Sequence, residues 1–303
     1  MHPVSVRVDN LTKRFSETVA LDDITFHVGK GELFGFIGPD GAGKTTLFRI
    51  LTTLLLPDRG TCTVEGCDVV KDYKRIRNMS GYMPGRFSLY QDLTVEENLN
   101  FFATIFGTTV HENYDLIKDI YQQIEPFKDR KAGKLSGGMK QKLALSCALI
   151  HKPEILFLDE PTTGVDAVSR LEFWEMLKRL KEAGITILVS TPYMDEASLC
   201  DRVALMQNGR IMSISTPLEV IRNYPLTLYS VKAGDIYQLL GELRNYPGVH
   251  SVYAFGQSAH VAFKGPANQA DLAAWLKAKN HQSVEITPIE ANIEDCFMEL
   301  MTA

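Results

Sequence analysis

The decisive stretch of the chain is Gly38-Pro39-Asp40-Gly41-Ala42-Gly43-Lys44-Thr45-Thr46, which fits the pattern GxxxxGK[ST]. An apolar run at residues 33–37 precedes it and a helical pattern follows it, as this pattern requires. Glycines let the backbone N–H groups wrap around an anion, and the N-terminus of the next helix adds positive dipole. We therefore predict that residues 38–46 bind the phosphates of a nucleotide.

Two side chains of this loop have specific expected roles. Lys44 is expected to reach the β and γ phosphates, and the hydroxyl of Thr45 is expected to hold Mg²⁺. The alternative is a glycine-rich turn that binds nothing. An acidic strand further along the chain makes that alternative weak.

The acidic strand consists of four apolar residues at 155–158 that lead to Asp159 and Glu160. We expect Asp159 to hold Mg²⁺ through its water shell and Glu160 to polarise the attacking water. Carboxylates at the end of a strand can also merely begin a turn, but a phosphate loop in the same chain favours the chemical role. The predicted ligands are ATP and Mg²⁺.

Short apolar runs alternate with amphipathic segments, which predicts an α/β fold. Residues 98–149 lack comparable strands and are expected to be helical. We expect a P-loop fold with a mostly parallel sheet, antiparallel edge strands and a helical subdomain at about residues 85–150. Edge strands are predicted at 4–8 and 24–28, and buried strands at 33–37, 155–158, 185–189 and 203–206.

The character of the chain changes after Tyr224 and Pro225. The predicted order there is strand, helix, strand, strand, helix, strand, with a hairpin about Gly256 and a final amphipathic helix at 293–301. This is the order of a ferredoxin-like α+β unit. We place the boundary near Asn223, which gives a first domain at 1–223 and a small C-terminal domain at 224–303.

Composition narrows the class of protein. The chain has 303 residues, of which 45% are hydrophobic and 23% charged, which is the range of globular proteins with one large and one smaller domain. No apolar run approaches the roughly 18 residues that cross a bilayer, and residues 1–10 do not resemble a secretory signal. We expect a cytoplasmic protein without a membrane span of its own.

Charge and cysteine usage exclude further classes. A net charge of −5 has the wrong sign for binding to nucleic acid. The odd number of cysteines, without CxxC spacing, argues against both a disulfide framework and a zinc site. The histidines at 111, 151, 250 and 260 have no evident metal-ligand partners, and none is assigned a role.

The segment Leu135-Ser136-Gly137-Gly138-Met139-Lys140-Gln141 is a serine-glycine turn that opens a helix, an arrangement that can present N–H groups and a hydroxyl to phosphate. Between the phosphate loop and the acidic strand, it closely resembles the signature of ABC ATPases. The resemblance covers about the first 220 residues.

This resemblance implies a composite site. In ABC ATPases two nucleotide-binding domains face head to tail, and ATP on one phosphate loop is capped by the signature of the other domain. It implies that Ser136, Gly137 and Gly138 contact the nucleotide of a partner. It also implies that Phe15 stacks on adenine and that Asp166 lies in the loop that signals between the two sites. Phe15 alone would read as an ordinary core aromatic.

Two positions depart from the family pattern. In Gly81-Tyr82-Met83-Pro84-Gly85 the residue after the proline is usually a glutamine that helps to bind Mg²⁺, and here it is Gly85. In Ser190-Thr191-Pro192-Tyr193 a histidine normally contacts the γ phosphate, and here the position is Pro192. Glycine has no side chain and proline has no donor, so neither supplies the missing polar group.

Three interpretations of these departures stay open. Hydrolysis survives slowly on Glu160 alone, a neighbour such as Gln91 or Tyr193 substitutes, or an intact partner domain supplies the competent site. We favour slow but real hydrolysis.

The resemblance also implies partners. Phe101, Phe102 and Phe106 fall where family members form the groove for a short helix of the membrane subunit, although packing within their own helix is the more common role of such aromatics. The final segment, Ile293-Glu294-Asp295-Cys296-Phe297-Met298-Glu299-Leu300, is similar to the end of ATP-binding subunits of ABC-2 type exporters of the daunorubicin kind.

The expected function is therefore ATP binding and hydrolysis that drive export through a separate membrane permease. We expect the chain to act at the cytoplasmic face of the membrane together with a second nucleotide-binding domain, identical or different. The alternatives are an ATP-responsive clamp that barely turns over, and a soluble ABC protein without a transport role. The transported substrate is not predicted.

Overall fold

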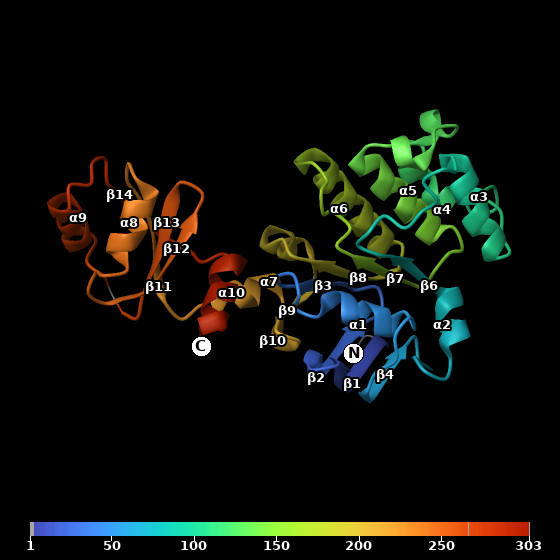
Figure 1. Ribbon diagram of the computed structural model, residues 1–303, viewed down its shortest axis with the longest axis horizontal. Coiled ribbons are helices and arrows are strands. Elements are labelled where there is room, and N and C mark those ends of the chain that lie inside the picture. The colour runs from blue at the N-terminus through green and yellow to red at the C-terminus, as the bar shows by residue number, and fades with distance from the viewer. Residues whose placement is uncertain (1–2, 266, 303) are drawn as a thin grey trace. The chain divides into compact units, whose positions relative to one another are not determined.

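The computed structural model describes residues 3–265 and 267–302 of the chain. The chain divides into two compact units after Pro217 (Figure 1), a few residues before the boundary that we expected near Asn223. Most of helix α7 (Pro217–Arg222) belongs to the second unit because the Cys296 thiol donates a hydrogen bond to the carbonyl of Val220 at 3.4 Å.

The first unit contains two sheets. One is antiparallel, with strand order β2-β1-β4-β5. The other has the order β10-β9-β3-β8-β7-β6 and is parallel from β9 to β6, with β10 antiparallel at one edge. The predicted mostly parallel sheet is therefore confirmed, with β10 as an antiparallel edge strand. The edge strands predicted at 4–8 and 24–28 belong instead to the separate antiparallel sheet, as parts of β1 and β2. The strands are β1 (Val4–Phe15), β2 (Thr18–Gly29), β3 (Leu33–Ile37), β4 (Arg59–Val64), β5 (Cys67–Asp68), β6 (Ser80–Met83), β7 (Ile155–Asp159), β8 (Thr186–Thr191), β9 (Arg202–Gln207) and β10 (Arg210–Ser215).

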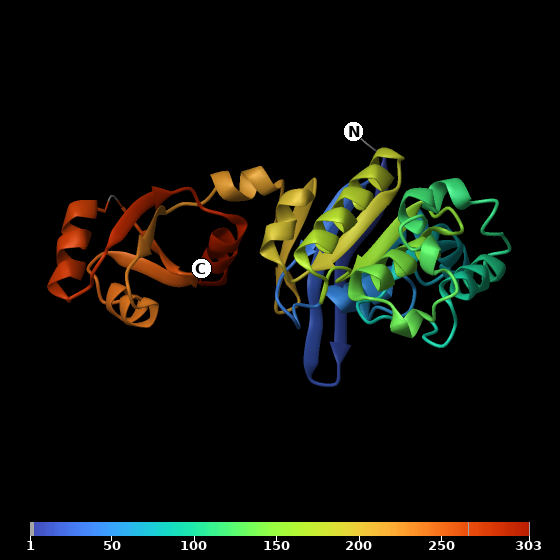
Figure 2. The same ribbon diagram turned by 90° about the horizontal axis from the view of Figure 1, so that it is seen from above.

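Three helices stand between β6 and β7, where the sequence predicted a helical insertion. They are drawn in teal and green and gather at one end of the unit (Figure 2). The first begins where Thr94 and Glu97 form a reciprocal capping box. The helices of the first unit are α1 (Lys44–Leu51), α2 (Tyr73–Met79), α3 (Val95–Ile105), α4 (Tyr114–Tyr121), α5 (Gly137–Leu149) and α6 (Ala167–Glu182).

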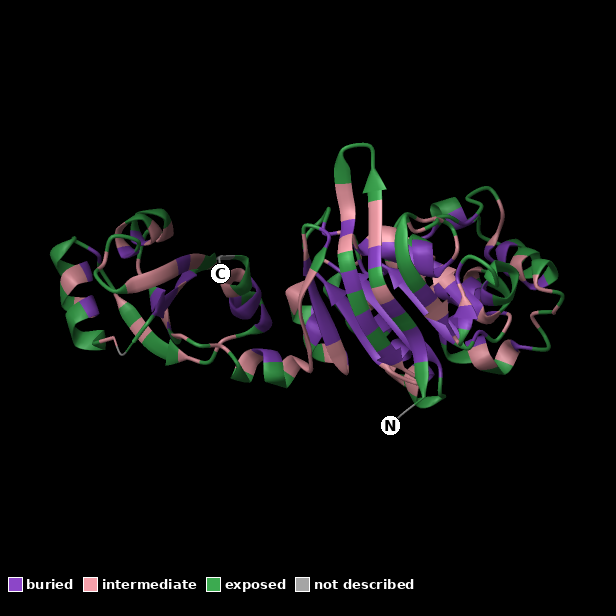
Figure 3. Cartoon of the chain, turned by 90° about the horizontal axis from the view of Figure 1, so that it is seen from below, coloured by how far each residue is buried: buried purple, intermediate pink, exposed green. Residues whose placement is uncertain are grey.

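Aromatic rings link α1 to the parallel sheet. Phe48 of α1 meets Phe36 of β3 and Phe157 of β7 edge to face, with centroids 5.7 and 6.0 Å apart. All five residues of β3 and of β7 are buried, and the purple of buried residues runs along the strands in Figure 3. The core therefore holds α1 firmly against the strands whose ends carry the predicted site.

The second unit is one antiparallel sheet with helices. Its strands have the order β12-β13-β11-β14, and Leu239 and Leu272 of two helices share a core with Val261 of the sheet. The last helix is held by histidines that the sequence left unassigned, because His260 and His250 contact carboxylates on it at 2.8 and 3.1 Å. The elements are β11 (Thr227–Lys232), α8 (Ile236–Leu243), β12 (Val249–Phe255), β13 (Ser258–Phe263), α9 (Gln269–Ala278), β14 (Glu285–Ile289) and α10 (Ile293–Thr302).

Two expectations about the whole chain concern membrane spans and thiols. Among the described residues, none of the helices combines the length and the hydropathy that a bilayer crossing requires. Cys62, Cys67, Cys147, Cys200 and Cys296 are all free and buried, so the predicted reduced, structural thiols agree with the structure.

Candidate nucleotide and catalytic site

The loop at residues 38–43 leaves β3 and turns directly into α1. Gly43 caps the helix with a φ of 103°, in the left-handed region, and a Cβ added there would lie 2.5 Å from the carbonyl oxygen of Ala20. Only glycine fits this turn without moving the neighbouring strand. The backbone of the loop is thereby bent so that the N-terminus of α1 faces the end of the sheet.

Lys44 is the buried cation of this loop, with 3% of its surface exposed. Its Nζ donates to the carbonyl oxygens of Gly38 and Pro39 at 2.7 and 2.9 Å and lies 3.5 Å from Oε1 of Glu160. Burial lowers the pKa of Lys44 from its ordinary value, against the opposing effects of Glu160 and Asp40. These partners leave Lys44 well placed to exchange them for the oxygens of a phosphate.

Glu160 and Asp159 are positioned by the neighbouring strand β8. The Ser190 hydroxyl donates to Oδ1 of Asp159 at 2.5 Å, and the backbone N–H of Glu160 donates to the carbonyl and the hydroxyl oxygen of Ser190 at 3.0 and 3.1 Å. Glu160 has a φ of 49°, in the left-handed region that costs a non-glycine residue some free energy. This turn brings the carboxylate of Glu160 to Lys44.

The donor set fits a magnesium ion that arrives with a nucleotide. The described residues contain no group of three or more His, Cys, Asp or Glu side chains that could hold a metal by themselves. Asp159 is buried, and Thr45 lies in the first turn of α1. One carboxylate and one hydroxyl suit Mg²⁺ only when phosphate oxygens and water complete its octahedron.

Phe15 lies at the end of a hairpin rather than in the core. It closes the β1–β2 hairpin, where Arg14 pairs with Val19, next to the Ala20 carbonyl that Gly43 approaches. Its surface is 46% exposed, and Lys13 Nζ lies 5.5 Å from its ring centroid. The interpretation as an ordinary core aromatic is therefore wrong, and an exposed ring is available for stacking.

The signature residues form a separate surface. Ser136 caps α5 by accepting a hydrogen bond from the Met139 N–H at 3.4 Å, and Ser136 and Gly137 are exposed. Figure 1 shows α5 and α1 on opposite sides of the parallel sheet. Asp166 is also exposed and caps α6 through the Ser169 N–H at 3.0 Å. One chain thus brings Lys44 and Glu160 together and leaves Ser136 on another face.

Comparison with known proteins agrees with this arrangement. The family model described as ABC transporter matches residues 21–163. The Nod factor export ATP-binding protein I of Burkholderia thailandensis is 33% identical over 99% of this chain and 98% of its own length. This chain belongs to the ABC transporter ATP-binding family.

Other relatives and solved structures are similar to this ABC protein over different shares of its length. The probable multidrug ABC transporter ATP-binding protein YbhF of Escherichia coli K12 is 37% identical over 99% of the chain, which spans only 53% of that relative. CbiO1 of Clostridium perfringens, part of the transporter complex cbiONQ, superposes with a TM-score of 0.66 over 73% of this chain and 92% of its own, at 27% identity. The dimeric cassette MJ0796, bound to ADP and Pi, has a TM-score of 0.63 over 70% and 98% of the two chains, at 25% identity.

Gly85, one of the two departures from the family pattern, lies close to the acidic strand of this ABC protein. A Cβ on Gly85 would be 3.1 Å from the Asp159 carbonyl oxygen, so the backbone there approaches the acidic strand more closely than most side chains permit. Of the two residues considered as substitutes, Tyr193 has another partner, because its ring centroid lies 4.4 Å from the guanidinium of Arg170.

A groove of about 420 Å³ lies between the parallel sheet and the helical segment. Met83, Leu89, Phe102 and Phe106 line it, and Ile105 at its margin is 59% exposed. Phe101 meets Tyr90 and Phe102 edge to face, with centroids 4.8 and 5.5 Å apart, so the phenylalanines also pack within their own unit, as the sequence favoured. A groove with an apolar lining and an exposed apolar margin is typical of a docking surface.

His151 forms part of this groove, which the sequence did not indicate. Its ring stacks on Phe106 with centroids 3.7 Å apart, and its Nε2 lies 3.2 Å from the Ser80 carbonyl oxygen. Burial lowers the pKa of His151, so the ring is neutral at pH 7 and acts as apolar wall. Only the tertiary contact of residue 151 with residue 106 reveals this role.

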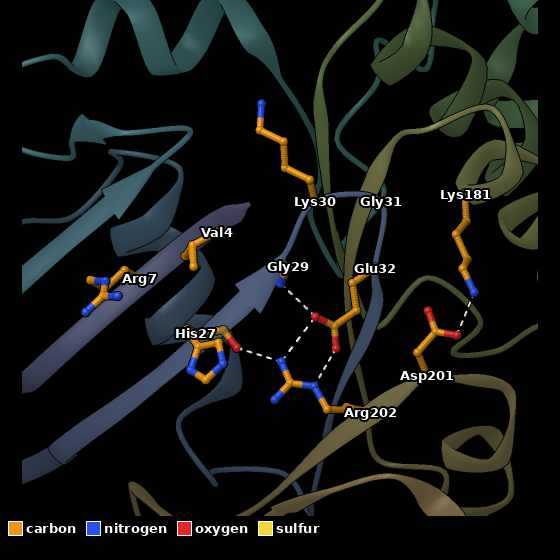
Figure 4. Close-up of a pocket in the computed structure, with 10 residues that line it drawn as sticks. All are labelled: Val4, Arg7, His27, Gly29, Lys30, Gly31, Glu32, Lys181, Asp201 and Arg202. Atoms are coloured by element: carbon orange, nitrogen blue, oxygen red, sulfur yellow. Dashed lines mark hydrogen bonds and ion pairs between the residues drawn. The ribbon is translucent and has the colours of Figure 1, made fainter. Parts of the chain in front are cut away.

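A second hollow, of about 740 Å³, lies at the opposite end of β3 from the phosphate loop (Figure 4). Four of the charged residues that line it form two ion pairs. Arg202 binds both carboxylate oxygens of Glu32 at 2.7 and 3.1 Å, and Lys181 binds Asp201 at 2.5 Å. These pairs brace the start of β3, and we assign the hollow no part in nucleotide chemistry.

Proposed function

We propose that this chain is the ATP-hydrolysing subunit of an ABC-2 type exporter and drives export through a separate permease. The observation that carries the proposal is the convergence of Lys44, at the start of α1, and Glu160, just after β7, whose side chains lie 3.5 Å apart. A phosphate-binding cation and a candidate general base at one site can both bind a nucleoside triphosphate and activate water.

Each residue of the proposed site is assigned one role. The N–H groups of residues 38–46 and the Lys44 ammonium bind the phosphates, Thr45 and Asp159 hold Mg²⁺, and Phe15 stacks on the base. Glu160 accepts the proton of the attacking water. Mg²⁺, when bound, would screen the charge of the phosphate oxygens.

Turnover in this proposal is slow. Gly85 and Pro192 provide no polar side chain where the family pattern has glutamine and histidine, so Glu160 works without two usual contacts. A second cassette, the same chain or another, would cap the nucleotide with residues equivalent to Ser136, Gly137 and Gly138 and would contact Asp166. The exposure of Ser136, Gly137 and Asp166 supports a composite site.

The groove supports the permease partner. A short helix with an apolar face would bury Ile105 and fill the space between Met83 and Phe102. Two relatives, a Nod factor export ATP-binding protein and a probable multidrug ABC transporter ATP-binding protein, support a role in export. Such a subunit would work at the cytoplasmic face of the membrane.

The C-terminal unit supports the ABC-2 assignment. The sheet order β14-β11-β13-β12, with element order strand, helix, strand, strand, helix, strand, leads us to assign a ferredoxin-like fold to residues 224–303. We assign the nucleotide-binding domain to residues 1–217, where the first compact unit ends, in place of the expected 1–223, and its helical subdomain to about 85–150.

A second candidate function is an ATP-responsive clamp that binds and closes but barely hydrolyses. The same two positions, Gly85 and Pro192, favour it. A soluble ABC protein without a transport role has less support, because it would have no membrane subunit to bind in the groove.

The test compares turnover of the purified chain with that of Glu160→Gln, which keeps the shape and removes the base. We expect the variant to bind ATP with affinity near that of the wild type and to hydrolyse it at least about tenfold more slowly. Equal residual rates would refute hydrolysis at this site. Single-turnover kinetics with radiolabelled ATP then separate slow chemistry from a clamp, since a clamp leaves bound ATP uncleaved.

A further inference from the structure

Glu196 is a buried carboxylate that the proposed chemistry does not use. It lies after β8 with 2% of its surface exposed, and three donors from different segments meet on it. The Thr162 hydroxyl and the Arg170 Nε donate to Oε1 at 2.7 and 3.2 Å, and the Thr191 hydroxyl donates to Oε2 at 2.6 Å. A buried carboxylate with this set of donors is held rigidly.

The three donors come from the parts of the chain that surround the site. Thr162 belongs to the turn that follows Glu160, in which the Thr163 N–H donates to the Glu160 carbonyl at 3.3 Å. Arg170 lies in the first turns of α6, the helix that Asp166 caps. Thr191 ends β8 immediately before Pro192.

The segment around Pro192 is oriented by the same network. The Tyr193 N–H donates to the Thr191 hydroxyl oxygen at 3.1 Å, and that hydroxyl donates its own proton to Glu196. Arg170 also binds Asp195 at 3.0 Å and lies over the Tyr193 ring. Pro192 has no donor that could bind a phosphate, so a nucleotide cannot fix this segment through that residue. Hydrogen bonds within the protein fix its position instead.

We propose that Glu196 is a positioning residue that fastens the turn carrying Glu160 and Asp166 to the segment carrying Pro192, so that they move as one body. This inference rests on the proposed function for its kinetic consequence. The connection between the two segments can be measured in the absence of any ATP turnover.

The test changes Thr162, because replacing this uncharged donor leaves the buried carboxylate of Glu196 itself in place. Thr162→Val removes one hydroxyl at constant volume, and Thr162→Ser keeps the hydroxyl. The matched control is Thr186→Val, which removes a buried hydroxyl from the other end of β8, where it accepts from the Gly31 N–H at 3.0 Å. Glu196→Gln keeps the shape and removes the charge.

We expect Thr162→Val to lower kcat about tenfold while KM for ATP changes less than about threefold, and Thr162→Ser to restore the rate. Glu196→Gln should also lower kcat, and Thr186→Val should leave it near that of the wild type. Equal kcat values for Thr162→Val and Thr186→Val would overturn the proposal, because any lost buried hydroxyl would then have the same effect.

Hydrogen exchange keeps the inference separate from the proposed function. If the wild type hydrolyses no faster than Glu160→Gln, the proposed hydrolysis fails and kcat carries no information on Glu196. Exchange measured by mass spectrometry should still rise in Thr162→Val at both residues 160–166 and 191–196. A rise confined to residues 160–166 would show that Glu196 does not connect the two segments.

Discussion

The Nζ of Lys44 lies 3.5 Å from Oε1 of Glu160, so the cation of the phosphate loop contacts the candidate base directly. The two residues come from different elements, α1 and the end of β7, and 116 positions separate them in the sequence. A triphosphate that binds Lys44 would draw its ammonium away from Glu160. Nucleotide binding and release of the base are thereby linked through one contact.

Lys44→Met should remove nucleotide binding without loss of stability. A charged hydrogen bond to phosphate contributes about 2 kcal/mol, so we expect ATP affinity to fall at least about 30-fold. The free energy of unfolding should equal or exceed that of the wild type, because methionine needs no hydration in this buried position. Titration calorimetry and urea unfolding measure the two quantities.

The pH dependence of stability provides a control for this variant. Burial lowers the folded-state pKa of Lys44 below its ordinary value of 10.5, so the unfolded state binds more protons in the interval between the two values. Wild-type stability should therefore gain, relative to Lys44→Met, as pH rises toward 10.5. If the difference in unfolding free energy between the wild type and Lys44→Met stayed constant from pH 7 to 10, burial would not lower the pKa of Lys44.

Restoring the two missing side chains should accelerate hydrolysis. Gly85→Gln combined with Pro192→His returns both polar groups of the family pattern, and we expect kcat to rise at least about tenfold. Gly85→Gln alone should help less, because it returns only one of the two polar groups. In both variants the loop must shift, since a Cβ at residue 85 would be 3.1 Å from the Asp159 carbonyl oxygen. A coupled assay of phosphate release measures the rate.

The control for the restored variant is the same pair of substitutions with Glu160→Gln. It should remain at the background rate, because the added groups assist a base that is then absent. A restored variant no faster than the wild type would favour the third interpretation, in which a partner domain supplies the competent site.

The sequence predicted the local parts of the site and missed its connections. Lys44 and Glu160 were identified because a short pattern and an apolar strand carry their signals in neighbouring residues. Their contact depends on the strand order β3-β8-β7, which no local pattern encodes. Glu196 was missed for the same reason, since its three partners are 5, 26 and 34 positions away.

Periodicity alone did not distinguish the two roles of one helix face. Phe101 packs against Tyr90 and Phe102, whereas Phe102 and Phe106 also line the groove. Aromatic side chains on a helix look alike in the sequence whether the neighbour is the same chain or a partner. Only the three-dimensional groove distinguishes the two.

The thiols should be almost unreactive in the folded protein. Burial raises the pKa of Cys62 to about 12 and that of Cys296 to about 11, against an ordinary value of 9.0. At pH 8 the thiolate fraction of Cys62 is then roughly a thousandfold below that of a free cysteine. Ellman's reagent should detect five thiols in guanidinium chloride and fewer than one in buffer. Fast reaction of a thiol in buffer would contradict the packing of its element.

Ile105→Glu should detach the chain from its proposed permease without unfolding it. The side chain is 59% exposed at the margin of the groove, so a carboxylate there costs the folded chain little and Tm should change by no more than about 2 °C. Docking of an apolar helix would bury that charge without a partner, which is strongly unfavourable. We expect the tagged wild type to retain an integral membrane protein in mild detergent and the variant to lose it.

Leu218→Glu is the matched control, because Leu218 is 65% exposed, is an isomer of isoleucine and lies outside the groove. It should keep the membrane protein that the wild type retains, as identified by mass spectrometry. If both variants lose that protein, added negative charge rather than the groove explains the effect. If neither loses it, the groove between Met83 and Phe106 is not where the permease binds, because a buried unpaired carboxylate would weaken any docked helix at least about tenfold.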